Sequence, residues 1–187
     1  MSNITELKHA AARVARDRDV NIPAGFNADG TNLGEAARVL LRRISYSKKP
    51  IDWTPASLML WLTKVAKGKI IYTQGSNRME GVTQKIEPPL WPHHGDCSSI
   101  ATWAYWVSEY PDPNGLGYSG VGYTGTLQDH GTKVVVPRVS DLVFYSNPDH
   151  VAVYVGGGRV IGFGHAGGPD NDPINYRPVW EIRRYAS

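Results

Sequence analysis

The sequence predicts an α+β fold, in which a helical region comes first and an antiparallel sheet follows. Residues 1–67 carry apolar side chains at helical spacing. From residue 70 onward the chain changes to aromatic, glycine and short β-branched runs, which are typical of strands joined by tight turns. The only cysteine, Cys97, begins an apolar stretch that reads as one further helix.

Helix starts define the first part of the chain. Three helix starts can be recognised. Two carry a side chain that can accept from free backbone N–H groups and a second one that can reach back to them, and the third carries a proline whose φ suits the first helical turn. They are Asn3 with Glu6, Asn32 with Glu35, and Thr54-Pro55. We therefore assign residues 1–67 to a helical N-terminal extension and residues 68–187 to the main domain.

Five short strands are predicted in the second part. They span residues 133–136, 141–145, 150–155, 159–163 and 179–185. Gly156-Gly157-Gly158 lies between two of them and is followed by no Lys-Ser/Thr pair, so we interpret it as a hairpin turn rather than a phosphate loop. Strands that follow one another so closely predict an antiparallel meander.

Composition excludes several classes of protein. A hydrophobic share of 41% with 20% charged residues is ordinary globular usage, and a net charge of +3 is a mild bias. One cysteine excludes an intrachain disulfide and suits a reducing compartment. No apolar signal-peptide core, bilayer-length apolar run or nucleic-acid-binding motif is present. We expect a monomer made in the cytoplasm, with neither nucleic acid nor a membrane as its partner.

Cys97 and two downstream histidines outline a thiol hydrolase. A cysteine in the first turn of a helix faces unpaired N–H groups and the positive end of the helix dipole, so we expect a stabilised thiolate. His150 opens a predicted strand whose alternation places Ala152 and Tyr154 on its own face. His165 follows the next strand, in a glycine-rich segment. A histidine held at the mouth of a strand can act as a base toward a cleft.

A zinc site is the alternative for the same residues. His94 precedes Cys97 by three positions, and His150 or His165 could complete a tetrahedral set. Structural zinc sites usually bring more cysteine, and no Cys-x-x-Cys pair occurs in the chain. We therefore expect no metal and no other cofactor.

Four motifs together resemble the NlpC-type cysteine peptidases, a branch of the papain-like fold that cuts peptidoglycan stem peptides. In order they are Asp96-Cys97-Ser98-Ser99, Ser140-Asp141-Leu142-Val143-Phe144-Tyr145, His150-Val151-Ala152-Val153-Tyr154-Val155-Gly156 and Gly164-His165-Ala166. The resemblance covers residues 70–187. Two positions depart from the family pattern, because Ser99 and Ser140 stand where the family has glycine.

The resemblance implies roles for six residues. Cys97 would be the nucleophile, His150 its base, and His165 the polar residue that orients the imidazole of His150. Three further residues would contact the substrate: Tyr72, Asp96 and Ser98. The implied reaction is attack of sulfur on an amide carbonyl, followed by hydrolysis of the acyl-enzyme.

The resemblance also implies a substrate and a setting. The expected bond is the amide between D-glutamate and a diamino acid in the stem peptide. Together with the cytoplasmic synthesis that we expect, it suggests a phage endolysin released to the wall through a holin-type pore, or a secretion-system effector. Alternatives are an amidase of the cysteine- and histidine-dependent amidohydrolase group, acting next to muramic acid or in cross-bridges, and a non-catalytic wall-binding module.

Overall fold

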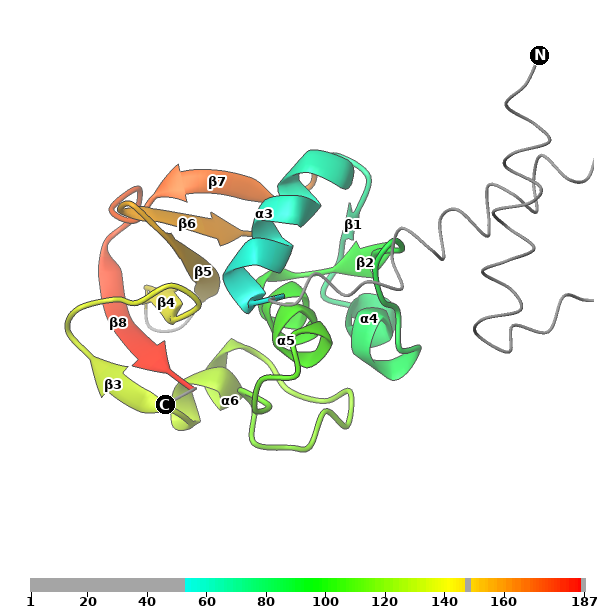
Figure 1. Ribbon diagram of the computed structural model, residues 1–187. Helices are drawn as coiled ribbons and strands as arrows, with labels where there is room; N and C mark the ends of the chain where they lie inside the picture. The colour runs from blue at the N-terminus through cyan, green and yellow to red at the C-terminus, as the bar shows by residue number, and fades with distance from the viewer. Residues whose placement is uncertain (1–52, 147–148, 186–187) are drawn as a thin grey trace, which may run out of the picture. The chain divides into compact units, whose positions relative to one another are not determined.

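The described part of the chain is built of helices and one six-stranded sheet, with a further pair of short strands. The computed structural model describes residues 53–146 and 149–185, within a unit that spans Asp52–Ser187. Figure 1 shows its elements, which in chain order are α3 (Pro55–Val65), β1 (Ile71–Tyr72), the 3-10 helix η1 (Ser76–Met79), α4 (Glu80–Thr83), β2 (His94–Gly95), α5 (Cys97–Val107), α6 (Thr124–Asp129), β3 (Thr132–Val134), β4 (Leu142–Tyr145), β5 (His150–Gly156), β6 (Arg159–Gly162), β7 (Asp170–Pro173) and β8 (Val179–Arg184). This combination confirms the predicted α+β class.

The main sheet is antiparallel and has the strand order β3-β8-β4-β5-β6-β7. Each of the five predicted strands is present. Strands β4, β5 and β6 form the predicted meander and β7 extends it, and residues 156–158 make the predicted hairpin turn, all three glycines with positive φ. The prediction of a simple meander is wrong at one edge of the sheet, because β8 lies between β3 and β4. Strand β7 was missed because its residues, Asp170–Pro173, are polar and include a proline.

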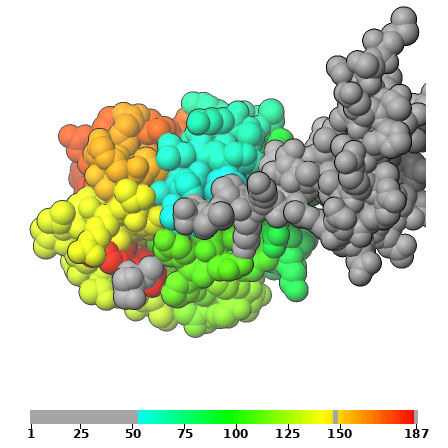
Figure 2. Space-filling view, viewed as in Figure 1, coloured from blue at the N-terminus to red at the C-terminus, as the bar shows by residue number. Residues whose placement is uncertain are grey.

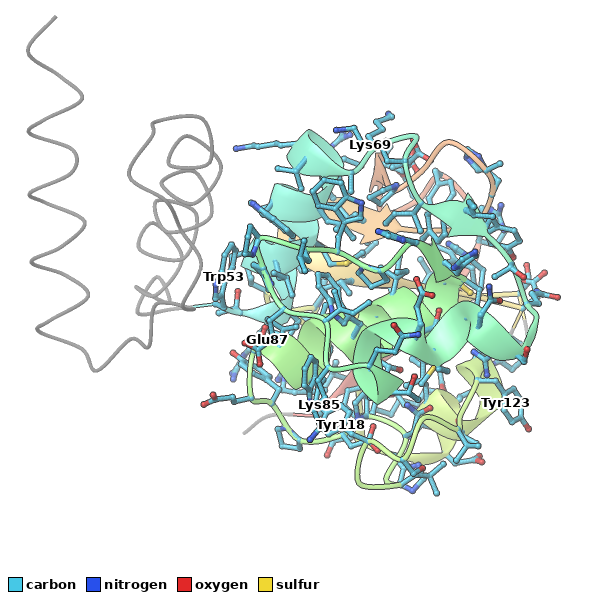
Figure 3. All side chains as sticks on the ribbon, turned by 90° about the vertical axis from the view of Figure 1, so that its right-hand side faces the viewer. Trp53, Lys69, Lys85, Glu87, Tyr118 and Tyr123 are labelled. Atoms are coloured by element: carbon cyan, nitrogen blue, oxygen red, sulfur yellow. The ribbon has the colours of Figure 1, made fainter. Side chains whose placement is uncertain are left out.

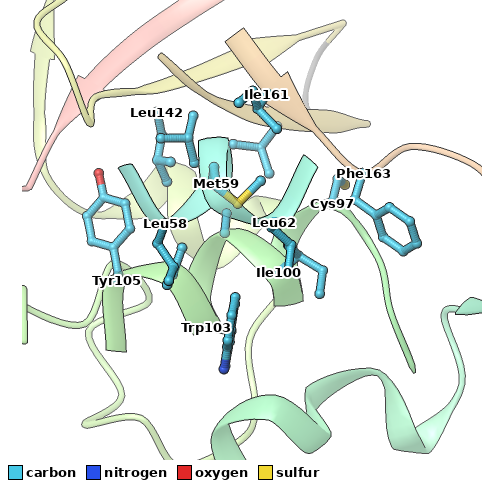
Figure 4. Packing of buried hydrophobic residues seen from close by; sticks show 14 of the residues in the cluster. Leu58, Met59, Leu62, Cys97, Ile100, Trp103, Tyr105, Leu142, Ile161 and Phe163 are labelled. Carbon is cyan, nitrogen blue, oxygen red and sulfur yellow. The ribbon is translucent and has the colours of Figure 1, made fainter. Parts of the chain in front are cut away.

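Helices α3 and α5 pack on the same side of this sheet (Figure 1). Figure 4 shows Leu58, Met59 and Leu62 of α3 directed into the shared core, where each is at most 1% exposed. Figure 2 shows α3 at the surface beside β6 and β7. Helix α3 is therefore part of the main unit, and the predicted boundary after residue 67 lies too late in the sequence. Its apolar face requires the sheet and α5 as partners.

The two faces of β5 contact different groups of residues. Val151 and Val153 belong to the core cluster under α3 and α5. Ala152 and Tyr154 pack in a second cluster on the opposite face, together with Tyr145. This is the alternation that the sequence predicts, and it gives His150 the face of Tyr145.

Both departures from the family pattern have a local explanation. Ser99 is the third residue of α5, and its Oγ accepts from the N–H of Asp96 at 2.8 Å, which completes a capping box. Ser140 has a φ of 77°, the left-handed region that favours glycine. Its Oγ accepts from the N–H of Ala56 at 3.2 Å, and its carbonyl accepts from the hydroxyl of Tyr105. These bonds hold a serine where the backbone favours glycine.

The helices predicted to begin near Asn3 and Asn32 lie outside the described residues. Within residues 53–146 and 149–185, none of the helices has the length and apolar character needed to cross a membrane.

Candidate active site

Cys97 is the first residue of α5 and lies at the edge of the core. Its side chain is 7% exposed, and Figure 4 shows it with Phe163 at one end of the cluster. The backbone N–H groups of Val151 and Ser98 are close enough to the sulfur to favour its ionised form, and the sulfur lies 3.8 Å from Oγ1 of Thr124. Helix α5 thus brings the thiol to the first residues of β5.

Burial raises the pKa of the Cys97 thiol, and the nearby charge of Asp96 adds to this effect. The hydrogen bonds from Val151, Thr124 and Ser98 act in the opposite direction but do not outweigh it. The expectation of a stabilised thiolate is therefore wrong for the free protein. A helix start lowers a thiol pKa only as long as desolvation does not exceed its effect.

The imidazole of His150 contacts two aromatic rings and lies against two glycines. It lies 5.9 Å from the ring of Tyr145 and 6.4 Å from that of Tyr176, measured between centroids. The ring edge formed by Nε2 and Cε1 lies against two glycines. A Cβ built on Gly162 of β6 would be 2.8 Å from Nε2, and a Cβ built on Gly164, which follows β6, would be 2.9 Å from Cε1. Glycine at both positions therefore leaves the room that the ring occupies.

His150 is neutral at pH 7. Burial lowers its pKa to about 4, and the guanidinium of Arg177 contributes in the same direction. A neutral imidazole can accept a proton and a protonated thiol can release one, so neither group carries the charge of a preformed ion pair in the free protein. The protonation states therefore favour general-base chemistry over a preformed thiolate–imidazolium pair.

In the structure, the imidazole of His165 contacts residues other than His150. Its Nε2 lies 3.0 Å from Oδ2 of Asp170, its Nδ1 lies 2.6 Å from the carbonyl oxygen of Ala166, and its side chain is 67% exposed. It is still near enough to His150 to lower the pKa of that residue electrostatically. Both ring nitrogens are therefore engaged away from His150, so the predicted bond between the two histidines is not formed in this arrangement.

Tyr72 lies near the nucleophile, as the resemblance implies. It stands in β1, which pairs in parallel with β2, and its ring contacts that of Phe163 at 5.7 Å. Burial raises its pKa, and the charge of Cys97 is the second cause. Its hydroxyl accepts from Nε2 of Gln74 at 3.4 Å. The hydroxyl stays protonated and can still donate.

Asp96 and Ser98, the two other predicted substrate contacts, bond to each other and to Arg78. Ser98 Oγ donates to Oδ1 of Asp96 at 2.9 Å, and Nη1 of Arg78 lies 3.1 Å from Oδ2 of Asp96 and 3.2 Å from Ser98 Oγ. Asp96 also caps α5, because its Oδ1 accepts from the N–H of Ser99 at 2.7 Å. Both side chains therefore already form hydrogen bonds to other groups of the protein.

Sequence reasoning missed Arg78, Thr124, Tyr176 and Gly162, which is one of the two glycines beside His150. None carries a signal that singles it out: Arg78 is one arginine in a short polar segment, and Thr124 follows a loop rich in glycine and tyrosine. Each contacts the site only through the tertiary fold.

The zinc alternative finds no support in the positions of its ligands. His94 Nδ1 pairs with Oε2 of Glu80 at 3.0 Å. Across residues 53–146 and 149–185, no three His, Cys, Asp or Glu side chains come together as a metal site would require.

Two tyrosines of the loop between α5 and α6 differ in their surroundings. Tyr118 is partly buried, and its hydroxyl donates to the carbonyl oxygen of Tyr110 at 2.6 Å. Tyr123 is 61% exposed, and Figure 3 shows it at the periphery of the domain. Of the two, only Tyr123 has its ring open to solvent.

Comparison with known proteins identifies the fold. A scan of family models and a search of curated proteins find no match. Among solved structures, the P60 domain of an antigen from Mycobacterium avium subspecies paratuberculosis is 17% identical with a TM-score of 0.50, over 71% of this chain and 96% of that one.

Two further solved structures are similar. The peptidoglycan hydrolase RipB from Mycobacterium tuberculosis is 15% identical, with a TM-score of 0.48 over 98% of this chain and 82% of that one. NlpC2 from Trichomonas vaginalis is 19% identical, with a TM-score of 0.44 over 72% of this chain, which spans about half (47%) of that protein. The described part of this chain has the fold of the NlpC/P60 proteins.

Proposed function

We propose that this domain is a peptidoglycan hydrolase that cleaves an amide of the stem peptide, with Cys97 as nucleophile and His150 as base. The observation that carries the proposal is the position of the sulfur. The backbone N–H of Val151, the residue that follows His150 in the chain, lies close enough to the sulfur to favour its ionised form. The NlpC/P60 fold, and a similar structure described as a peptidoglycan hydrolase, support the substrate class.

The protonation states define the first step. The thiol of Cys97 is protonated and His150 is neutral near pH 7. As sulfur attacks the carbonyl carbon, the S–H proton moves to the imidazole, and the carbonyl electron pair moves to oxygen. Negative charge appears on sulfur as its proton leaves and passes to the carbonyl oxygen as the C–S bond forms. The N–H of Val151 and the hydroxyl of Thr124 are placed to stabilise it.

The second step releases the amine. The tetrahedral intermediate collapses, its C–N bond breaks, and the imidazolium gives its proton to the leaving nitrogen. Water, deprotonated by His150, then attacks the thioester and frees the carboxylate and the thiol. The N–H of Cys97 at the start of α5 is one donor for the oxyanion. The N–H of Ser99 is not available for this purpose, because it donates to the side chain of Asp96. Tyr72 is placed to contact the substrate near the sulfur.

The experiment that tests this function is digestion of purified sacculi, followed by mass spectrometry of the released fragments. Wild type is expected to create new amino termini within the stem peptide, and Cys97→Ala none. His130→Ala is a matched control, because this histidine bonds to the carbonyl oxygen of Thr126 and takes no part in the site. Equal release by wild type and Cys97→Ala would reject the proposal.

The same products decide the finer predictions. A free amine on the diamino acid identifies the D-glutamyl bond, whereas a free L-alanine amine identifies the amidase alternative. An endolysin role additionally predicts loss of turbidity when the protein is added to cells with permeabilised outer layers. Wall binding without any new terminus would identify the non-catalytic module.

A further inference from the structure

Tyr176 lies in the connection between β7 and β8, and its ring packs nearly at a right angle against the imidazole of His150. The two ring centroids are 6.4 Å apart and the ring planes meet at 86°. The same tyrosine ring lies 5.0 Å from that of Tyr145 at 67°, and Tyr145 in turn lies 5.9 Å from the imidazole at 31°. Steeply inclined rings at such distances are a favoured arrangement. The three rings therefore form one cluster, on the face of the sheet that Tyr145 shares with His150.

Hydrogen bonds hold the segment that carries Tyr176 against the sheet. Tyr145 is fully buried in β4, and its hydroxyl donates to the carbonyl oxygen of Ile174 at 3.0 Å. The N–H of Ile174 donates to the carbonyl oxygen of Gly158 at 2.8 Å, and the N–H of Tyr176 donates to that of Pro173 at 3.0 Å. The segment is thus tied both to the hairpin between β5 and β6 and to a buried residue of β4.

The imidazole of a histidine depends on such contacts for its orientation. Its χ2 torsion is broad, so packing decides where the two ring nitrogens point. A turn of the His150 ring about χ2 would break the right-angled contact with Tyr176. His165 does not provide this restraint in the structure, because its own ring nitrogens contact Asp170 and the carbonyl oxygen of Ala166.

We propose that Tyr176 is a positioning residue for the base, whose ring fixes the imidazole of His150 in the orientation that takes the proton of Cys97. This inference rests on the proposed function. It assigns to an aromatic ring the task that the resemblance implies for His165. Arg177 adds to the packing of the ring, since its guanidinium carbon lies 5.4 Å from the Tyr176 centroid. Tyr176 needs no contact with the substrate for this role.

The same contact has a consequence for the titration of the imidazole. Burial is the largest cause of the low pKa of His150, and the rings of Tyr145 and Tyr176 exclude water from it. Burial also raises the pKa of both tyrosines, that of Tyr176 to about 12, so both are neutral near pH 7. The charged groups that act on the imidazole are Arg177 and His165, which lower its pKa, and Asp149, which raises it.

The test measures kcat and KM for a soluble tetrapeptide stem as a function of pH, for wild type, Tyr176→Ala and Tyr176→Phe. In Tyr176→Ala we expect kcat to fall roughly tenfold to a hundredfold and KM to change less than about twofold, because only the base is displaced. The acid limb of kcat/KM should move to higher pH, since water reaches the imidazole while the charged groups around it remain. Tyr176→Phe keeps the ring and should retain kcat within about threefold of wild type.

Two further variants are controls. Tyr154 packs in the same cluster but lies four residues along β5 from His150, roughly 13 Å away. Tyr154→Ala should therefore keep the wild-type kcat and the wild-type acid limb. His165→Ala should lower kcat less than Tyr176→Ala does. If Tyr176→Ala does not fold, as judged by circular dichroism, Tyr176→Leu keeps the apolar volume without the flat ring, and kcat should still fall about threefold or more.

Wild-type kcat in folded Tyr176→Ala, or in Tyr176→Leu in its place, would overturn the inference and leave the proposed function intact. An equal loss in Tyr176→Phe and Tyr176→Ala would overturn it as well, because the hydroxyl rather than the ring would then act. So would a larger loss in His165→Ala, or a rise in KM with an unmoved acid limb in Tyr176→Ala. If wild type cleaves no stem peptide and releases nothing from sacculi, the proposed function fails, and this inference fails with it.

Discussion

The backbone N–H of Val151 lies close enough to the sulfur of Cys97 to favour its ionised form, although 54 positions separate the two residues in the chain. Helix α5 carries the thiol to the beginning of β5, and the residue before Val151 is His150. The thiol comes from the helix-covered face of the sheet, whereas His150 shares the face of Tyr145. The two faces meet where β5 begins, and the chemistry proposed above depends on that junction.

The first prediction concerns the reactivity of Cys97. Because burial raises the pKa of its thiol above the ordinary value, alkylation of the folded protein should be slow at pH 7 and should still be accelerating above pH 9. Iodoacetamide labelling followed by intact-mass spectrometry measures this rate. In denaturant the same thiol should show an ordinary titration. A rate that is already maximal at pH 6 would indicate a preformed thiolate and contradict the account.

The second prediction concerns stability in acid. The pKa of His150 is lowered from 6.5 to about 4 by folding, so the native imidazole stays neutral while the unfolded one becomes charged between these values. The unfolded state binds more protons there, and stability is lost as pH falls from about 6.5 to about 4. The shift corresponds to about 3 kcal/mol.

Urea unfolding between pH 7 and pH 4, compared for wild type and His150→Gln, isolates this contribution. The variant should lose about 3 kcal/mol less over the same range, since it lacks the titrating group. Identical pH dependence in both proteins would mean that His150 is not buried in its neutral form.

The third prediction concerns the strand beneath the imidazole. A Cβ on Gly162 would be 2.8 Å from Nε2 of His150 and 3.2 Å from Cβ of Ala152, so Gly162→Ala must displace the ring. We predict a fall in kcat of about tenfold to a hundredfold, since a misplaced base loses much of its catalytic contribution. Gly157→Ala is the comparison, because its φ of 59° makes it costly in stability while nothing lies within 4 Å of its Cβ. Equal kcat in Gly162→Ala and wild type would show that the ring has room to spare.

The fourth prediction concerns Thr124. Its Oγ1 lies 3.8 Å from the sulfur, where it can stabilise the negative charge that grows during attack. Thr124→Val keeps the shape and removes the hydroxyl, so kcat should fall roughly threefold to tenfold, as for one lost hydrogen bond. Thr124→Ser should retain most of the activity. If Val and Ser at this position behave alike, the hydroxyl has no part in the reaction.

Local patterns in the sequence were sufficient to predict the elements that carry the proposed chemistry. The helix at Cys97 was predicted from its apolar run, and strands β4 to β6 from β-branched runs joined by short turns. Each of these signals lies within a few residues. The polar edge strand β7 and the position of β8 between β3 and β4 depend on pairing across the chain, which no local pattern records.

The site shows the same division. Cys97 and His150 could be selected by motif, but the protonation of the thiol could not, because it depends on how deeply the fold buries the sulfur. The partners of Asp96 and His165 could not be predicted from the sequence either. Arg78 approaches Asp96 from another element, and Asp170 approaches His165 from the missed strand β7.

The most direct measurement of the central claim is kcat/KM for a stem peptide as a function of pH, for wild type and His150→Ala. If His150 takes the proton from Cys97, the variant should lose roughly 10²–10⁴-fold near pH 7. It should regain part of that loss as the pH rises and hydroxide ionises the thiol. Equal activity at pH 7, or a loss that stays constant up to pH 10 in a folded variant, would contradict the assignment of His150 as the base.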